Sequence, residues 1–152
     1  MRSEGIDTTE MYPDKFYKDD VIEHLQLDYD VVLYFGHGIR GAWSGYNRIT
    51  IKDLRTIKSK HTQKTIMSLS CYSMCDTQKD EKSFGDHIID NSLANCVLGY
   101  NDKIKYESNL QFMNLLLDNY LTEKHDNFRT YLSAFLKDKY SLLELPLKLL
   151  MI

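Results

Sequence analysis

Three short apolar runs divide the chain, and each is ended by glycine or by polar residues. They cover residues 30–36, 65–70 and 95–100. The runs are continuous rather than alternating, and the first is rich in β-branched and aromatic side chains, a pattern typical of strands buried on both faces of a sheet. We therefore predict three central strands.

Apolar residues at helical spacing lie before and between these runs. Tyr17, Val21 and Leu25 predict a helix that begins near residue 14, with Pro13 in its first turn. The segment 83–86 has the pattern of a capping box and predicts a helix that continues through residue 91. The chain thus alternates between predicted helices and strands.

The remaining segments give further elements. Residues 48–51 predict a short edge strand, 52–58 a short helix and 128–139 a longer helix, whereas the glycine-rich segment 37–47 predicts a loop. A stripe of apolar residues also predicts an amphipathic helix that packs against the core through Leu110, Met113, Leu117 and Leu121.

This alternation predicts parallel strands joined by right-handed crossovers, and hence an α/β sandwich with a short, mainly parallel sheet between helices. We expect a single domain over residues 1–152, in which residues 1–13 are a loosely held lead-in. Residues 145–152 contain six apolar side chains among eight, and this tail either folds over the core or is covered by a partner.

Composition excludes several classes of protein. With 152 residues, 43% of them hydrophobic and 27% charged, the chain can bury a core of its own. Nineteen basic and 22 acidic residues give a net charge of −3, which disfavours binding to nucleic acid. No segment is apolar enough to span a membrane, so we expect no membrane partner. Without a signal peptide the expected compartment is the cytoplasm, or the exterior if the natural chain carries an upstream signal.

Two reactive side chains directly follow predicted strands. His37 comes after the first apolar run and Cys71 after the second. Because neighbouring parallel strands end at the same edge of a sheet, we expect both side chains in one cleft. An imidazole beside a thiol can activate it or protonate a leaving group, which is sufficient chemistry for hydrolysis of an amide bond.

Several motifs occur together with these two residues. YFGHG at residues 34–38 is followed by Trp43, then by SLSC at 68–71, SFGD at 83–86 and VLGY at 97–100. This ordered set resembles the gingipain-type cysteine peptidases of the caspase-like clan, to which caspases, legumains and clostripains also belong. The resemblance covers residues 19–121 and implies a caspase-like sandwich that acts as a cysteine endopeptidase on peptide or protein substrates.

Carried over residue by residue, the resemblance makes Cys71 the nucleophile of an acyl-enzyme mechanism and His37 the general acid or polarising group. It makes the backbone amides of Gly38 and Cys71 the oxyanion hole, and Trp43 a candidate substrate-binding residue. The chemistry of such a dyad requires no metal or organic cofactor.

The chain also departs from the family pattern. Family members have additional strands before the histidine-bearing strand, so the chain is expected to be a fragment, or to need a second copy, a further subunit or flanking sequence. No carboxylate that would read a basic residue at the cleavage site precedes Cys71. The alternative function is therefore a catalytically inactive caspase-like module that binds other proteins.

The other cysteines and histidines have simpler interpretations. Cys96 lies inside an apolar run and is expected to be structural. Cys75 is a loop thiol, a resolving thiol for Cys71 or a metal ligand, although Cys71, Cys75 and His87 lack a recognised zinc spacing. We expect His87 to be structural, and three further histidines to be solvated: His24, His61 and His125.

Overall fold

The fold is built on one central sheet. The structure, a computed structural model, describes residues 8–58, 60, 64–77, 81–122, 127–143 and 145–151, and within them a four-stranded sheet has the order β1-β5-β6-β7. The strands β1 (Val31–Phe35), β5 (Thr65–Leu69) and β6 (Cys96–Tyr100) are parallel. β7 (Leu147–Met151) pairs with β6 in the antiparallel sense. All three predicted strands are therefore present, with β5 and β6 in the centre of the sheet and β1 at its edge.

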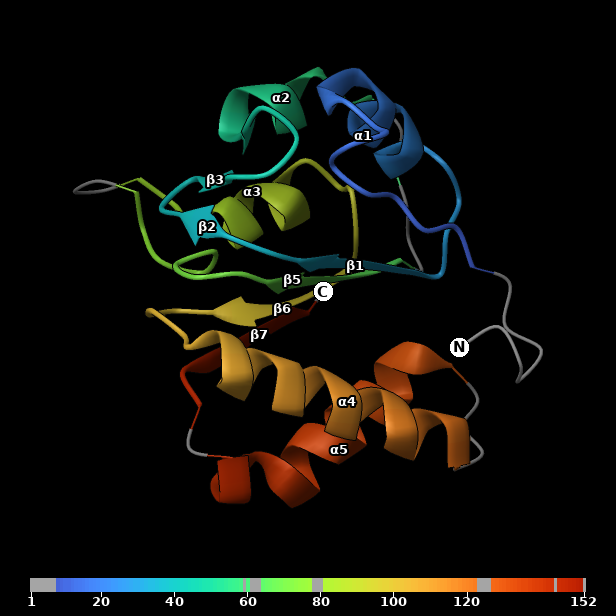
Figure 1. Cartoon of the computed structure of the whole chain (residues 1–152), viewed down its shortest axis with the longest axis vertical. Coiled ribbons are helices and arrows are strands. Elements are labelled where there is room, and N and C mark those ends of the chain that lie inside the picture. The colour runs from blue at the N-terminus through green and yellow to red at the C-terminus, as the bar shows by residue number, and fades with distance from the viewer. Residues whose placement is uncertain are drawn as a thin grey trace.

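Helices cover both faces of this sheet (Figure 1). On one side lie α1 (Lys18–Leu25), α2 (Ile51–Thr56) and α3 (Phe84–Asp90), and on the other lie α4 (Tyr106–Thr122) and α5 (Phe128–Leu143). The predicted class, a three-layer α/β sandwich with a short and mainly parallel sheet, is confirmed.

The two faces of the sheet form separate hydrophobic cores, because successive side chains of a strand point to opposite faces. Tyr34 and Ile66 belong to the core beneath the first three helices. Met67 and Leu69 belong to the core beneath α4 and α5, against which Phe35 also packs. β5 and β6 are buried on both sides, which explains why their sequences do not alternate. The prediction of full burial was wrong for β1, which has one neighbouring strand in the described sheet and is mostly half-buried.

The segment predicted as a loop, residues 37–47, contains regular structure instead. β2 (Gly38–Ile39) and β3 (Ala42–Trp43) form a tight hairpin, and β4 (Ile49–Thr50) adds to it in a small antiparallel sheet. Strands this short leave no periodic pattern in a sequence. The predicted edge strand at residues 48–51 is real, but it belongs to this small sheet.

Helix boundaries show where local signals act. α1 begins at Lys18, not near residue 14, and Pro13 lies in a turn ahead of it. The side chain of Asp20 accepts a hydrogen bond from the Tyr17 backbone N–H at 2.7 Å, which satisfies the start of the helix there. Part of the predicted lead-in is also held, since Met11 packs against the core.

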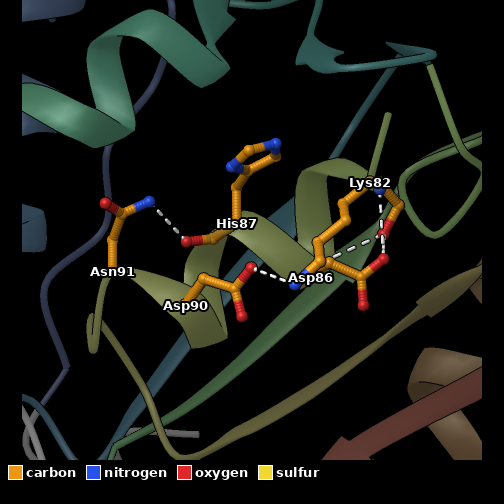
Figure 2. A network of polar contacts seen from close by, with 6 residues as sticks. Lys82, Asp86, His87, Asp90 and Asn91 are labelled. Carbon is orange, nitrogen blue, oxygen red and sulfur yellow. Dashed lines mark hydrogen bonds and ion pairs between the residues drawn. The ribbon is translucent and has the colours of Figure 1, made fainter. Parts of the chain in front are cut away.

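The capping box predicted at Ser83 is confirmed. The Ser83 hydroxyl accepts a hydrogen bond from the Asp86 N–H, and the Asp86 carboxylate accepts one from the Ser83 N–H, each at 3.1 Å. Figure 2 shows this first turn of α3 together with the ion pair between Lys82 and Asp90, which spans the helix at 2.8 Å. The capping box therefore fixes the start of α3, and the Gly85 N–H donates to the Ser73 carbonyl at 3.0 Å, two residues beyond the SLSC segment.

In the C-terminal third, one prediction was wrong in detail. The α4 side chains that are fully buried are Asn109, Phe112 and Leu116, whereas the predicted stripe of Leu110, Met113 and Leu117 is only half-buried. The side chain of Leu121 lies outside the described residues. The apolar tail is the strand β7, and its Leu150 is the register partner of Val97 on β6.

Candidate active site

The register of the sheet relates His37 to Cys71. Phe35, the last residue of β1, is paired with Leu69, the last residue of β5. His37 and Cys71 each follow two residues later, so both lie just beyond the carboxyl ends of adjacent parallel strands, the edge where α/β proteins bind ligands. His37 is exposed, and Cys71 is half-buried.

Gly38 brings the two loops into contact. A Cβ atom placed on Gly38 would lie 2.5 Å from the Cys71 carbonyl oxygen and 2.7 Å from Cβ of Ser70. No side chain fits at these distances, so only glycine allows the backbone after His37 to lie against the backbone of Cys71. The close approach of the two backbones thus explains why the second glycine of the YFGHG motif, Gly38, is needed.

A loop that follows β6 contacts the Cys71 thiol. The Ile104 N–H donates to Sγ at 3.3 Å, and Sγ lies 3.5 Å from the Ile104 carbonyl oxygen. The N–H of Tyr72 donates to the Asp102 carbonyl at 3.2 Å. Residues 101–105, which we call the 101–105 loop, are therefore attached to Cys71 and to the residue after it.

The turn that carries Cys71 is packed against two glycines. Met74 lies in this turn, and a Cβ atom on Gly85 of α3 would come within 2.2 Å of its Sδ. A Cβ atom on Gly99 of β6 would come within 2.7 Å of its Cγ. The glycines of SFGD and VLGY therefore make room for this turn, which sequence reasoning had not explained.

A series of buried hydrogen bonds supports the end of β5 from the face of the sheet that α4 covers, opposite to the face covered by α3. The Asn109 amide donates to the Leu69 carbonyl at 2.8 Å, and the Tyr100 hydroxyl donates to the Asn109 side-chain oxygen at 2.8 Å. Burial, with a smaller contribution from nearby Cys71, raises the pKa of Tyr100, so its hydroxyl remains a donor. Asn109 was missed by the sequence analysis, although a polar residue beside the apolar positions of a helix was the available signal.

Trp43 lies inside the core and is 2% exposed. Its indole N–H donates to the Ser68 hydroxyl on β5 at 2.7 Å, and its ring stacks on Tyr34 with centroids 4.4 Å apart. The expectation that Trp43 binds substrate stays a prediction, and its burial argues for a supporting role. It joins the hairpin after His37 to the strand before Cys71.

Three backbone and side-chain contacts hold the loop that bears His37. The His37 carbonyl accepts one hydrogen bond from the Ser44 N–H at 2.9 Å and another from the Tyr34 hydroxyl at 2.8 Å. The same hydroxyl accepts from the Gly45 N–H at 3.0 Å. Tyr34 was quoted within the YFGHG motif but was given no role.

The remaining thiols differ in their surroundings. Cys96 is fully buried on β6, as predicted, and burial raises its pKa. Cys75 is half-buried, and its thiol donates to the Asn101 carbonyl at 2.6 Å. Burial also raises the pKa of Cys75, which disfavours its thiolate form.

Among the histidines, His24 is half-buried rather than solvated, since its Nδ1 lies 2.8 Å from the Asp20 carbonyl oxygen and its ring stacks on Tyr29. His87 lies on α3, and Figure 2 shows its carbonyl accepting from the Asn91 side chain. His61 and His125 lie outside the described residues. No group of three potential metal ligands occurs in the part of the chain that the structure describes.

Within the same described residues, no helix is long and apolar enough to cross a membrane.

The site therefore combines a histidine and a cysteine beyond register-paired strand ends, glycines that allow close backbone approach, and buried polar supports on both faces of β5. The profile of Peptidase family C25 matches residues 2–148, nearly the whole chain, and the protein belongs to that family, the gingipain family to which its motifs point.

The chain is also similar to a solved structure. One solved chain, described as "Structure of Protease", is 18% identical and aligns with a TM-score of 0.47 over 57% of this chain. The alignment spans 19% of the length of that solved chain. No curated protein matches the sequence.

Proposed function

We propose that this chain carries the catalytic centre of a cysteine endopeptidase, in which Cys71 is the nucleophile and His37 the general acid. The observation that carries the proposal is the register of β1 and β5, together with the contact of Gly38 with Cys71. Membership of Peptidase family C25 supports the reaction class.

The ends of β1 and β5 add support. Phe35 and Leu69 both pack in the core beneath α4 and α5. Beyond these two residues the chain bends at Gly36 and at Ser70, and the Cys71 sulfur contacts Ile104, just ahead of α4.

The reaction then follows from the chemistry of the two groups. The Cys71 thiolate attacks the carbonyl carbon of the scissile amide, and the resulting oxyanion accepts hydrogen bonds from the backbone N–H groups of Gly38 and Cys71. The carbon–nitrogen bond breaks as His37 protonates the departing amine, which leaves a thioester. Water hydrolyses the thioester and releases a carboxylate and the free thiol.

One observation favours the alternative function. In the conformation described, the Cys71 sulfur is occupied by the backbone of Ile104, and such a thiol is not free to attack a substrate. A catalytically inactive module that binds other proteins would keep this contact permanently. A peptidase must release it during turnover.

Labelling with a peptidyl chloromethyl ketone decides between these functions. We expect one adduct per chain on Cys71, abolished in Cys71→Ala and retained in Cys75→Ala, the matched control four residues away. Hydrolysis of fluorescein-labelled casein should follow the same pattern, with activity lost in Cys71→Ala and His37→Ala. Labelling of Cys75 or Cys96 in place of Cys71, or parental activity in Cys71→Ala, would exclude the proposed nucleophile.

A further inference from the structure

The hydroxyl of Tyr34 is surrounded by the backbone of the loop that carries His37. It donates to the His37 carbonyl at 2.8 Å and accepts from the Gly45 N–H at 3.0 Å. It therefore joins the start of this loop to its end, across the β2–β3 hairpin. Tyr34 itself is anchored on the central strand β1 and is 9% exposed.

The space around this hydroxyl depends on two glycines. A Cβ atom on Gly36 would lie 2.9 Å from the Tyr34 hydroxyl oxygen, and one on Gly45 would lie 3.0 Å from it. Both distances are shorter than ordinary contacts of carbon with oxygen, so a side chain at either position would press on the hydroxyl. Gly36, the glycine before His37, thus leaves room for the Tyr34 hydroxyl.

The tyrosine ring is fixed as firmly as its hydroxyl. It stacks on Trp43 with an interplanar angle of 11°, and Trp43 is hydrogen-bonded to Ser68 on the cysteine-bearing strand. Burial raises the pKa of Tyr34, so the hydroxyl keeps its proton and remains a donor. These contacts connect the backbone of His37 to the strand that ends before Cys71.

We propose that Tyr34 is a positioning residue for His37. The Tyr34 hydroxyl fixes the backbone of His37 and thereby the place of the imidazole relative to the Cys71 sulfur. The proposal rests on the proposed function for its catalytic consequence, but its geometric claim can be tested apart from peptidase activity. Without the Tyr34 hydroxyl, the His37 carbonyl keeps only its hydrogen bond from Ser44, and small misplacements of a reacting group lower the rate of a chemical step strongly.

The first variant is Tyr34→Phe, which keeps the stacked ring and removes the hydroxyl. With fluorescein-labelled casein we expect the rate at saturating casein to fall about tenfold or more, while the casein concentration that gives half the maximal rate stays unchanged. Tyr46→Phe is the matched control, because the Tyr46 hydroxyl also donates to a backbone carbonyl, that of Met11, at 2.6 Å. Equal rates in Tyr34→Phe and Tyr46→Phe would overturn the proposal.

The second variant perturbs the Tyr34 hydroxyl by a change at Gly45. It tests the proposal even if Tyr34→Phe fails to fold. Gly45→Ala should slow casein hydrolysis when Tyr34 is present, because its methyl group displaces the hydroxyl. In the Tyr34→Phe background the same change should have little further effect, since the atom that it displaces is gone. Losses that multiply fully in the double variant would contradict the proposal.

A third measurement does not depend on peptide hydrolysis. Alkylation of Cys71 by iodoacetamide, followed by peptide mass spectrometry from about pH 5 to 9, reports how the imidazole influences the thiol. We expect His37→Ala to change this pH profile, Tyr34→Phe to shift it in the same direction, and Tyr46→Phe to leave it as in the parent. If Cys71→Ala hydrolyses casein at the parental rate, the proposed function fails while this profile still tests the positioning. A profile unchanged in Tyr34→Phe, or insensitive to His37→Ala, would overturn the positioning role.

Discussion

At the scale of single residues, buried polar groups do most to define this structure, because each needs a partner once it leaves water. The Trp43 indole N–H on the small sheet and the Ser68 hydroxyl on β5 satisfy each other through a hydrogen bond. Lys64 provides a second case, since it is 1% exposed and lies directly before β5. Its ammonium donates to the carbonyls of Leu25 and Leu27 at 2.9 and 2.6 Å, which closes the C-terminal end of α1.

The buried Lys64 gives the stability of the protein a defined pH dependence. Burial lowers its pKa from 10.5 to about 8. Between these values the unfolded chain binds more protons at this site than the folded one, so the free energy of unfolding contributed by Lys64 rises with pH. The slope cannot exceed about 1.4 kcal/mol per pH unit.

Urea unfolding of the parent and of Lys64→Met from about pH 7 to 9.5 measures this contribution. We expect the parent to gain stability relative to Lys64→Met as the pH rises through this window. Stopping there avoids the titration of tyrosines, whose ordinary pKa is about 10. A difference that stays constant with pH would show that the folded-state pKa of Lys64 is normal.

At the scale of elements, the three apolar runs were the most predictable part of the fold. β5 and β6 are buried along their whole length, so burial dictates their composition, whereas four of the five residues of β1 are half-buried. Short-range chemistry predicted the start of α3 equally well, because the Ser83 capping box is a local contact. The start of α1 was misplaced because Pro13 is also a common turn residue, and only the Tyr17–Asp20 contact shows where the helix begins.

Elements that depend on distant partners could not be predicted in the same way. β7 has an apolar sequence that fits a tail as well as a strand, and its identity comes from pairing with β6. The strands β2 and β3 are two residues long, and the contacts of Gly38 and Trp43 with β5 hold them in place. The histidine and the cysteine of the candidate site were visible in the sequence, whereas their supports Tyr34 and Asn109 required the tertiary contacts.

The packing of the turn after β5 leads to a prediction about two glycines. Gly99→Ala should destabilise the protein by about 1–3 kcal/mol, because its methyl group meets the Ser73 hydroxyl and the inner part of the Met74 side chain. Gly85→Ala should lower the stability less, because the atoms nearest to its methyl group are at the flexible far end of the Met74 side chain.

Thermal or urea unfolding of the two alanine variants checks this order. Replacing Met74 by alanine in each background should recover part of the loss caused by Gly85→Ala, because the colliding sulfur is removed. The Gly99→Ala loss should persist in part, because the Ser73 hydroxyl remains in the way. The reverse order of stabilities would mean that Met74 does not occupy the space between α3 and β6.

At the scale of the whole molecule, the candidate site lies where the two helical layers meet the carboxyl edge of the sheet. The layer of α1, α2 and α3 supports the His37 loop through Tyr34 and Trp43. The layer of α4 and α5 supports β5 through Asn109 and reaches Cys71 through the 101–105 loop. The site therefore depends on both cores, although it projects from one edge.

The contact of the 101–105 loop with Cys71 makes a prediction about reaction rates. If the loop must leave the thiol before an electrophile can enter, loop opening comes before the chemical step, and the observed rate of labelling should level off at high concentrations of a peptidyl chloromethyl ketone. The plateau should be the same for two ketones that differ in their leaving-group reactivity. Rapid mixing followed by mass spectrometry measures it, and a rate that rises linearly without limit would show that the loop does not obstruct the sulfur.

In the proposed peptidase, this attachment limits how quickly a substrate can be processed. Opening must break the hydrogen bonds of Ile104 with Cys71 and of Tyr72 with Asp102, in a segment that continues directly into α4. The frequency of opening then sets an upper bound on turnover that no improvement in the reacting groups can exceed. A ligand that displaces the 101–105 loop by its own binding would escape this bound. The loop can therefore discriminate between substrates by how fast each one opens it, as well as by their shape.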